Sequence, residues 1–357
     1  MQFSHLHCHT QFSLLDGAAD IKKLFKKAKA DNMPAVAITD HGNMFGVFEF
    51  VAEGNKQGIK PIVGCEFYVV EDRHIRQFTK EKKDVRHHQL LLAKDELGYK
   101  NLAKMCSLGD IEGMYGKYPR IDKELIVKYH KGLIATTCCI GAIIPKTIIR
   151  KGEAEAEKEF KWWLDLFGED FYVELQRHEI RDQYIVNEVL IRFARKYNVK
   201  IICSNDSHYV DQEDWNAHDI LLCINTGDKQ STPSAKDFDD DKGIPKGSRF
   251  AFFNDQFYFK NTSEMMQLFH DLPESLDNTN EIVDKIKTLN LHKDILLPNF
   301  PIPEEFKTHT LSDMVGKKEL TPDVLNQWEY LKHLTFEGAK FKYGTITPEI
   351  EDRLNFE

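Results

Sequence analysis

Short apolar runs alternate with amphipathic stretches over the first 225 residues, and this alternation restricts the fold more than any other feature. The apolar runs, rich in Val and Ile, cover 2–7, 35–39, 60–70, 88–93, 132–137, 171–175 and 199–204. The stretches with helical periodicity cover 18–32, 45–57, 95–107, 122–130, 153–167, 181–197 and 213–224. Strands that are apolar throughout and separated by helices indicate a parallel sheet covered by helices. The alternation therefore predicts a barrel of seven β/α units.

Two segments interrupt this pattern. Residues 71–87 are charged and irregular, so we expect no helix between the strands at 60–70 and 88–93. Residues 226–249 are polar and rich in Gly, Pro and Asp, which indicates a long loop. The following stretch, "FAFFNDQFYFKN" (250–261), predicts a β-hairpin or a pair of strands.

The last hundred residues have a different character. Two helices are expected at 263–271 and 275–288, and three prolines within 296–306 indicate a linker. The remainder is mostly helical and stops in mid-pattern at Glu357. We therefore expect this chain to be the front part of a longer protein.

Composition excludes several classes of protein. The 357 residues carry a net charge of −9, so contact with nucleic acid must be local or assisted by metal ions. No run of eighteen apolar residues and no signal peptide pattern occurs, which predicts a cytoplasmic protein without a membrane partner. None of the seven cysteines forms a Cys-x-x-Cys pair, which disfavours a disulfide scaffold or a zinc ribbon.

The opening stretch "HLHCHTQFSLLDG" places His5, His7 and His9 at alternate positions. Side chains two apart on a strand share one face, and two such imidazoles can bind the same metal ion. A polar strand face would explain a single histidine. Three in register, followed by Asp16, favour a metal site.

Other predicted strands carry ligand-type residues at or near their ends. These residues are Asp40, His41, Glu66, His87, His88, Cys138, Cys139, Asp206 and His208. The carboxyl ends of barrel strands form the functional rim, although the position of His88 at the start of its strand does not follow from that rule. Each residue alone has a structural explanation as a turn, core or cap residue. Their joint occurrence favours a site.

The motifs "HLHCHTQFSLLDG", "AITDHGNMFG", "IVGCEFY", "YPRID", "CSNDSHYV" and "NDQFYFKN" resemble the polymerase and histidinol phosphatase (PHP) domain that begins bacterial DNA polymerase III alpha subunits. The resemblance extends from Phe3 to about Leu289. It implies a distorted seven-stranded (β/α) barrel over residues 1–288, with a loop and hairpin insertion at 226–262. Residues 289–357 would then be a linker and the truncated beginning of a polymerase palm.

The resemblance also implies a set of nine metal ligands: His7, His9, Asp16, His41, Glu66, His88, Cys138, Asp206 and His208. His87 and Cys139 remain alternatives to their neighbours, and Ala142 replaces a glutamate that is common in the family. His5 is expected beside the ligands and not among them.

This ligand set implies three divalent ions, with Glu66 as a carboxylate bridge between two of them. One ion would take His7, His9 and Asp206, the second His88 and Cys138, and the third Asp16, His41 and His208. Imidazoles with one thiolate suit zinc best, while manganese or iron are also compatible with the carboxylates. The residues expected to act in catalysis are Asp16, His41, Glu66 and His208.

Closely spaced divalent ions activate water and neutralise charge on phosphate, so the expected reaction is phosphodiester hydrolysis. In a replicative polymerase the resemblance implies a 3′→5′ exonuclease acting on DNA. One alternative is a metal-braced scaffold that docks the separate proofreading subunit and supports the polymerase. Another is a small-molecule phosphatase, which the "NDQFYFKN" segment and the extension after residue 296 disfavour. The implied partners are DNA, the rest of the alpha subunit, the proofreading subunit and the sliding clamp.

Other charged and aromatic residues are weaker candidates. Arg120 in "YPRID" is a candidate contact to DNA phosphates near the rim. Trp162 and Trp163 are expected to pack a helix. The lysines between residues 22 and 29 are expected to form a solvated face, with a surface that faces DNA as the alternative. The acidic run 239–241 is also expected to be solvated, and not to replace the paired aspartates that a polymerase needs for catalysis. This chain should therefore show no template-directed synthesis.

Overall fold

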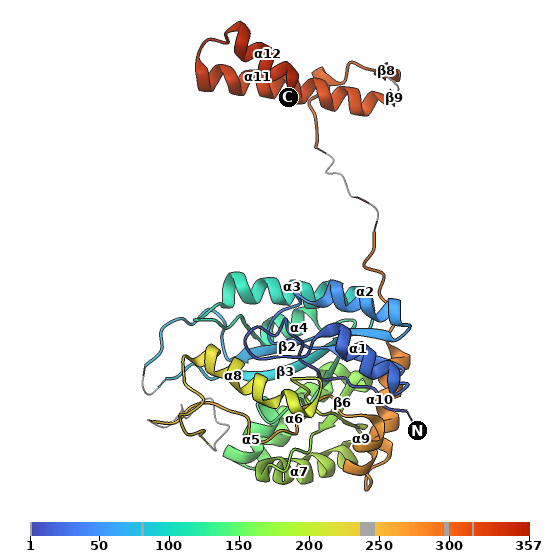
Figure 1. The fold of residues 1–357 in the computed structure, drawn as a ribbon, viewed down its shortest axis with the longest axis vertical. Helices are drawn as coiled ribbons and strands as arrows, with labels where there is room; N and C mark the ends of the chain where they lie inside the picture. The colour runs from blue at the N-terminus through green and yellow to red at the C-terminus, as the bar shows by residue number, and fades with distance from the viewer. Residues whose placement is uncertain (1, 80–81, 236–246, 294, 296–299, 316–317) are drawn as a thin grey trace. The chain divides into compact units, whose positions relative to one another are not determined.

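The computed structural model describes residues 2–79, 82–235, 247–293, 295, 300–315 and 318–357. The chain forms two compact units, Met1–Leu291 and His292–Glu357 (Figure 1). The acidic run 239–241 and part of the expected proline linker lie outside the described residues. Every described helix is too short or too polar to cross a lipid bilayer.

The first unit is built on a curled seven-stranded sheet with helices packed outside it (Figure 1). Its strands are β1 (Ala35–Ile38), β2 (Lys60–Val70), β3 (His87–Ala93), β4 (Arg120–Asp122), β5 (Leu133–Thr136), β6 (Phe171–Leu175) and β7 (Ile201–Cys203). The order is β1-β2-β3-β5-β6-β7, and β4 pairs with the end of β2. This α/β architecture confirms the expected fold class, although the barrel is not fully closed.

Strand β3 is antiparallel to both of its neighbours, β2 and β5, whereas the other pairs in this sheet are parallel. The expectation of a wholly parallel sheet is therefore wrong at β3. The reason is the connection at 71–86, which contains no described helix and returns at the end of the sheet that β2 has reached. This absence of a helix confirms the prediction for that segment.

The first predicted strand, at 2–7, does not form a regular ladder. His5 pairs with Val36 of β1, and Cys8 pairs with Ser207 after β7. The segment thus contacts both ends of the sheet in turn. Because its hydrogen bonds alternate between two partners, it makes isolated bridges and not a continuous strand.

The predicted hairpin at 250–261 is also absent from the described residues. Instead, Tyr258 bridges to Tyr209 in the chain after β7, and the amide of Phe259 donates to the carbonyl oxygen of Tyr209 (2.9 Å). These aromatic residues therefore pack against the segment that follows the last strand.

The helices of the first unit lie close to the predicted positions. They are α1 (Ile21–Ala30), α2 (Val47–Gln57), α3 (Glu96–Gly113), α4 (Lys123–Tyr129), α5 (Ile143–Lys151), α6 (Glu153–Phe167), α7 (Arg181–Tyr197), α8 (Trp215–Thr226), α9 (Thr262–Leu268) and α10 (Glu274–Lys285). Only α5 has no predicted counterpart. It carries Pro145 in its first turn, where a missing amide proton is tolerated.

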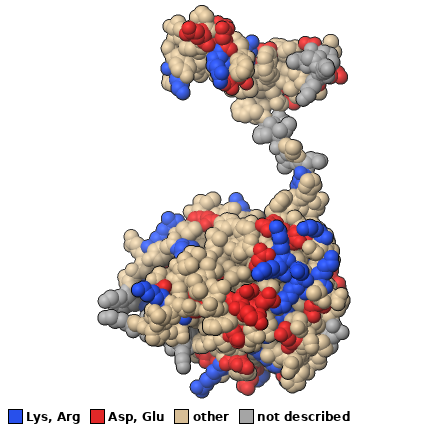
Figure 2. Space-filling view, viewed as in Figure 1, with Lys and Arg blue, Asp and Glu red and all other residues tan. Residues whose placement is uncertain are grey.

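The amphipathic helices pack as their sequences indicate. Trp163 of α6 is fully buried, with Trp162 half-buried beside it, which confirms that this pair packs a helix. On α1 the apolar residues Leu24 and Phe25 are buried, and four of the five lysines are exposed. Figure 2 shows Lys and Arg side chains gathered on the side where α1 lies.

The second unit is mostly helical, as expected. It contains a short hairpin, β8 (Asp313–Val315) with β9 (Lys318–Leu320), followed by α11 (Pro322–Tyr343) and α12 (Pro348–Phe356). Thr321 and Thr347 cap the two helices, and each cap is followed by a proline in the first turn. The assignment of this unit to a polymerase palm stays a prediction.

Candidate metal centre

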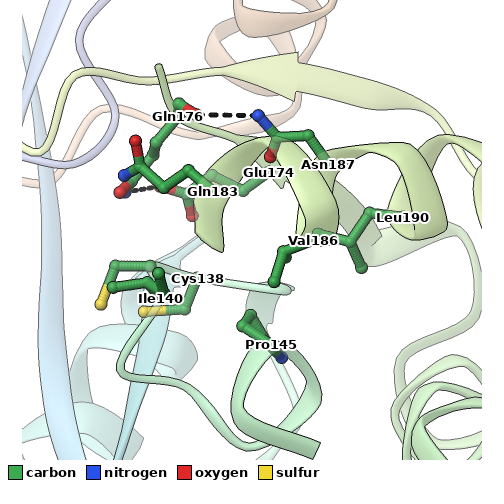
Figure 3. Close-up of a pocket in the computed structure, with 10 residues that line it drawn as sticks. Cys138, Ile140, Pro145, Glu174, Gln176, Gln183, Val186, Asn187 and Leu190 are labelled. Atoms are coloured by element: carbon green, nitrogen blue, oxygen red, sulfur yellow. Dashed lines mark hydrogen bonds between the residues drawn. The ribbon is translucent and has the colours of Figure 1, made fainter. Parts of the chain in front are cut away.

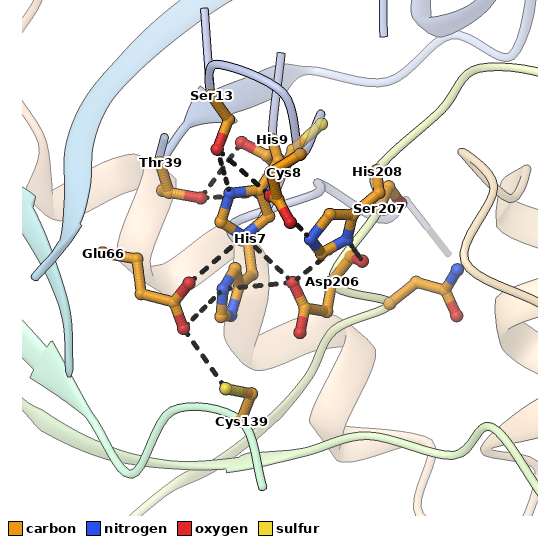
Figure 4. Close-up of polar contacts among 12 residues, drawn as sticks. His7, Cys8, His9, Ser13, Thr39, Glu66, Cys139, Asp206, Ser207 and His208 are labelled. Carbon is orange, nitrogen blue, oxygen red and sulfur yellow. Dashed lines mark hydrogen bonds and ion pairs between the residues drawn. The ribbon is translucent and has the colours of Figure 1, made fainter. Parts of the chain in front are cut away.

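The opening segment places two imidazoles in the interior of the first unit. His7 Nε2 lies 3.5 Å from Glu66 Oε1 and 3.3 Å from Asp206 Oδ1. His9 Nε2 lies 3.3 Å from Glu66 Oε2 and 3.1 Å from the same aspartate oxygen. Figure 4 shows both rings directed between the two carboxylates. The structure thus brings together residues from the amino terminus, β2 and the chain after β7.

Glu66 occupies the centre of this arrangement and is fully buried. Further side chains reach its carboxylate oxygens: His41 Nδ1 at 2.9 Å, His88 Nδ1 at 3.2 Å, Cys138 Sγ at 3.1 Å and Cys139 Sγ at 3.2 Å. A carboxylate within reach of so many ligand-type atoms has the position that a bridge between two metal ions requires.

Asp16 forms a second focus at the edge of the cluster. Its Oδ2 lies 3.2 Å from His41 Nε2 and 3.3 Å from His208 Nε2. The other nitrogen of His208 lies 2.8 Å from the backbone oxygen of Asp206. His41 therefore connects the two foci, because its two nitrogens face Glu66 and Asp16.

The reversed direction of β3 explains the position of His88. The carboxyl end of β2 and the amino end of β3 meet at the same edge of the sheet, where Tyr68 is the register partner of His88. His88 therefore faces the cluster from the start of its strand. His87 points to the opposite face, because neighbouring residues on a strand alternate. Gly141 packs against the His88 ring, where a Cβ atom would meet Nδ1 at 2.9 Å.

The backbone is unusual at two of the expected ligands. Cys138 and Asp206 have positive φ angles of 58° and 45°. Such angles are uncommon for residues other than glycine and concentrate at functional sites. At Cys138 this turn leaves both cysteine thiols near Glu66, so the choice between Cys138 and Cys139 as the ligand stays open.

Five buried polar atoms of the cluster lack partners with hydrogen-bond geometry. Those atoms are His7 Nε2, His9 Nε2, His41 Nδ1, Glu66 Oε2 and Asp206 Oδ1. Buried polar atoms in proteins are almost always paired, so this concentration calls for a bound group. Among the described residues, ligand atoms lie within 4.8 Å of one another in the groups His9–Asp16–His41–His208, His7–His9–Glu66, His41–Glu66–His88 and Glu66–Cys138–Cys139. This set of nitrogen, oxygen and sulfur donors fits divalent metal ions.

Without metal, the pKa values of the carboxylates in the cluster depend on the neighbouring imidazoles. Burial disfavours the carboxylate of Glu66, but the imidazoles of His88, His41 and His7 outweigh burial and hold its pKa well below the usual value. Burial likewise opposes ionisation of Asp16, whose pKa His41 and His208 keep well below normal. The site therefore favours carboxylates in their ionised form, which is the form that binds metal.

Glu174 on β6 belongs to the site, although the sequence analysis did not select it. Its Oε1 lies 2.7 Å from His7 Nδ1, and its oxygens accept hydrogen bonds from Thr136 and Ser204, both at 2.5 Å. A carboxylate behind an imidazole fixes the ring and directs the other nitrogen toward a metal ion. The available signal was a single acidic residue within the apolar run "FYVEL".

Two other selected residues face elsewhere. Asp40 accepts hydrogen bonds from the amide and hydroxyl of Thr10, at 2.6 and 2.9 Å, and so fixes the turn beside His9. His5 Nε2 lies 2.8 Å from the carbonyl oxygen of Lys260, and its ring lies 4.0 Å from that of Phe259. Burial lowers the pKa of His5 to about 3, so this imidazole is a neutral core residue.

Arg120 is fully buried, contrary to the surface position that a contact with DNA phosphates requires. It donates to Asp84 (2.6 Å) and to the carbonyl oxygens of Gly113 and Ile75 (both 2.8 Å). Nearby, Arg73 pairs with Asp122 at 2.8 Å. We call Arg73, Asp84, Arg120 and Asp122 the arginine network; it fastens the segment 71–86 to β4.

A cavity of about 730 Å³ opens in front of the cluster. The expected ligands that line it are Asp16, His41, Glu66, His88, Asp206 and His208. A second cavity, of about 10 Å³, lies behind Cys138 and Glu174 and has room for about one water molecule (Figure 3). The large cavity is therefore the one that can admit a substrate.

Comparisons with known proteins identify the family of the chain. A family model described as the PHP domain matches residues 5–178. The DNA polymerase III subunit alpha of Borreliella burgdorferi is 43% identical over 360 residues, which cover all of this chain and 28% of that protein. The subunit of the same name from Treponema pallidum is 35% identical over 358 residues, with the same coverage of both chains.

Among solved structures, a protein proposed to be a metal-dependent phosphoesterase from Bifidobacterium adolescentis superposes with a TM-score of 0.39 and 15% identity. The match covers 58% of this chain and 88% of that one. The chain spans little more than a quarter of the curated relatives named above. It belongs to the PHP domain family, in the branch formed by the amino-terminal region of bacterial DNA polymerase III alpha subunits.

Proposed function

We propose that this site hydrolyses phosphodiesters with the help of divalent metal ions, and that its substrate is the 3′ end of a DNA strand. The observation that carries the proposal is the group of buried imidazole and carboxylate atoms that meet without hydrogen-bond partners at the base of a large cavity. The cavity brings a substrate to the cluster residues that line it, which are Asp16, His41, Glu66, His88, Asp206 and His208. The similarity to polymerase alpha subunits supports DNA as that substrate.

The side chains divide into deep and accessible ligands. His7 and His9 are fully buried and would hold a metal ion together with Glu66 and Asp206. His41, His88 and His208 line the cavity and would hold ions at its floor, with Cys138 or Cys139 beside Glu66. Bound divalent ions would supply charge neutralisation for the phosphate and activation of water. We propose three ions, with zinc as the first choice and manganese or iron as alternatives.

Asp16, His41, Glu66 and His208 are the residues that we propose act in the reaction. Asp16 positions the imidazoles of His41 and His208 at the cavity floor through contacts of 3.2 and 3.3 Å. These rings would hold the ions that contact the scissile phosphate. Glu66 holds the surrounding histidines in place through its two oxygens.

The test is release of mononucleotides from a 3′-labelled single strand in the presence of Mn²⁺ or Zn²⁺. We expect Asp16→Asn and His208→Ala to reduce the rate more than about 100-fold, because each removes a group held directly at the cluster. The matched controls Asp165→Asn and His270→Ala change exposed residues and should retain the rate. Equal rates in the site variants and the unmodified protein would overturn the proposal.

A structural role for the metals is the second candidate. The cluster joins the opening segment, β2, β3 and the chain after β7, so bound metal would also brace the fold. Metal binding can contribute roughly 10 kcal/mol to folding. In this case chelation would lower the melting temperature while no variant altered hydrolysis above background. DNA, the remainder of an alpha subunit, a proofreading subunit and a sliding clamp are proposed partners under either function.

A further inference from the structure

The cavity in front of the cluster has the size of a small-molecule site. Its volume of about 730 Å³ falls within the range of about 300–1,000 Å³ that holds a drug-sized ligand. A mononucleotide is a ligand of that size, whereas a base-paired helix is much wider. The cavity thus limits what part of a nucleic acid can reach the cluster.

One wall of the cavity is a series of stacked and edge-on side chains. The guanidinium of Arg86 lies 3.8 Å from the ring centroid of Tyr118, and that ring lies edge-on to Tyr68 at 5.1 Å. The ring of Tyr68 stacks on His41 at 5.6 Å. This wall therefore runs from a residue of the cluster to an arginine without interruption.

Further aromatic side chains line the cavity. Phe252 lies edge-on to His208 at 4.7 Å and to Phe257 at 4.5 Å. Phe45, which also lines the cavity, is 63% exposed. An exposed phenyl ring beside a polar site is an available surface for stacking a base.

The cavity lining also carries positive charge, although the chain as a whole is acidic. Arg86, Lys117 and Lys146 line it, with Asp110 as an acidic lining residue away from the cluster. Arg86 pairs with Asp84 at 2.6 Å, which fixes its guanidinium over Tyr118. Lys146 is mostly buried, with its Nζ 3.4 Å from the carbonyl oxygen of Arg86. The ammonium group of Lys146 therefore lies against the backbone of Arg86.

We propose that this cavity is a binding site for the unpaired terminal nucleotides of single-stranded DNA, and that Phe45 and Arg86 determine this specificity. Phe45 stacks a base, and Arg86, with Lys146 also in the lining, holds a backbone phosphate. Aromatic stacking accepts any base and needs an unpaired strand, so the site admits single strands of any sequence and excludes paired ends. This inference rests on the proposed function and names the form of its substrate.

The test is the affinity of the full chain for a short fluorescein-labelled single strand, compared with the same strand in a blunt duplex, measured by anisotropy. We expect the duplex to bind more weakly, and we expect Phe45→Ala and Arg86→Met each to weaken single-strand binding about ten-fold, on the scale of one lost stacking or phosphate contact. Phe48→Ala and Arg76→Met are the matched controls. Phe48 is 65% exposed, Arg76 is also exposed, and neither lines the cavity.

Hydrolysis of the labelled strand is followed in the same samples. Equal affinity for duplex and single strand, or equal losses in the Phe45 and Phe48 variants, would contradict this inference even if the DNA is degraded. Selective binding without hydrolysis would contradict the proposed function and leave the binding site in place. We also expect Phe45→Ala to raise KM while leaving kcat nearly unchanged.

Discussion

The first unit contains two buried clusters of charged side chains, and they differ in how their polar atoms are satisfied. In the arginine network, Arg120 donates to Asp84 and to backbone carbonyls, and Arg73 pairs with Asp122. In the ligand cluster, His7, His9 and Glu66 face one another with atoms that have no hydrogen-bond partner. Burial alone therefore does not mark a functional site.

The difference shows what each cluster does. A buried cation whose donors are all hydrogen-bonded to acceptors needs no further ligand. Its effect is to hold together the segments that carry the donors and the acceptors. Buried imidazoles and carboxylates that lie close together without hydrogen-bond partners need a further group between them. The arginine network therefore holds the chain in place, and the ligand cluster is the one that calls for a bound group.

The largest effect on stability should come from the arginine network. Arg120→Met leaves Asp84 and several backbone carbonyls buried with fewer donors, which costs about 3–5 kcal/mol for a broken buried pair. Urea unfolding measures this loss. Arg192→Met, which removes an exposed ion pair with Glu153, should leave stability nearly unchanged. A comparable loss in both variants would remove the distinction between buried and exposed pairs.

The ligand cluster should respond in metal binding more than in folding. We expect Glu66→Gln to weaken metal binding more than about 100-fold, because it removes the central carboxylate. This loss is larger than the one expected from changing a residue that only holds a ligand in place. Elemental analysis after dialysis against a metal buffer gives the stoichiometry. If Glu66→Gln retains the full metal content of the unmodified protein, Glu66 is not a bridge.

Glu174 should give an intermediate effect. Glu174→Gln keeps the size of the side chain but weakens its contact with His7, so metal affinity should fall about 10- to 100-fold. The change Glu174→Asp keeps the negative charge but shortens the side chain, so it shows whether the position of the carboxylate or its charge matters for metal affinity. Competition with a chelator measures the affinity. An unchanged affinity in both variants would show that the His7 ring is held by packing alone.

The smallest expected effect is a pH dependence confined to the metal-free protein. Burial disfavours the charged imidazole of His88, but Glu66 outweighs burial and raises its pKa to about 10. A raised pKa stabilises the fold fully below the unfolded value of about 6.5, and this stabilisation is lost as the pH rises through about 10. The melting temperature in EDTA should therefore fall across that window.

Metal should suppress this dependence, because bound ions replace the protons of the cluster. Melting curves recorded with and without Zn²⁺ over the same pH range make the comparison. Arg73 of the arginine network provides no titration in this window, because, although burial opposes its charge, Glu112 and Asp122 raise its pKa above the usual value. A flat profile in EDTA would show that His88 is not charged in the metal-free fold.

The fold was predictable wherever local periodicity decides it. The ranges expected for α6 and α7 agree with the structure to the residue, because amphipathic patterns and nearby turn residues define both helices. The direction of β3 depends on where the segment 71–86 returns, and no local pattern encodes that. The opening segment does not form the predicted strand for a similar reason, because it pairs with two different segments of the chain.

The site was predictable where the residue type itself carries the chemistry. His7, His9, Glu66, Asp206 and His208 lie together in the structure, whereas His5 faces the core; the roles assigned to these residues stay predictions. Glu174 was missed because an acidic residue within an apolar strand gives no indication of its partner. Arg120 was assigned to the surface because only tertiary structure shows that the segment 71–86 packs over its side chain.

The reversal at β3 has a consequence for how such a protein can change. The segment 71–86 starts and ends at the same edge of the sheet, beside the cavity, and carries Arg86. Because β2 and β3 pair directly with each other, a change in the length of their connection need not shift their register. Insertions and deletions there would remodel the entrance to the cavity while the ligand cluster stayed in place, which makes this connection the natural place to engineer a different binding preference.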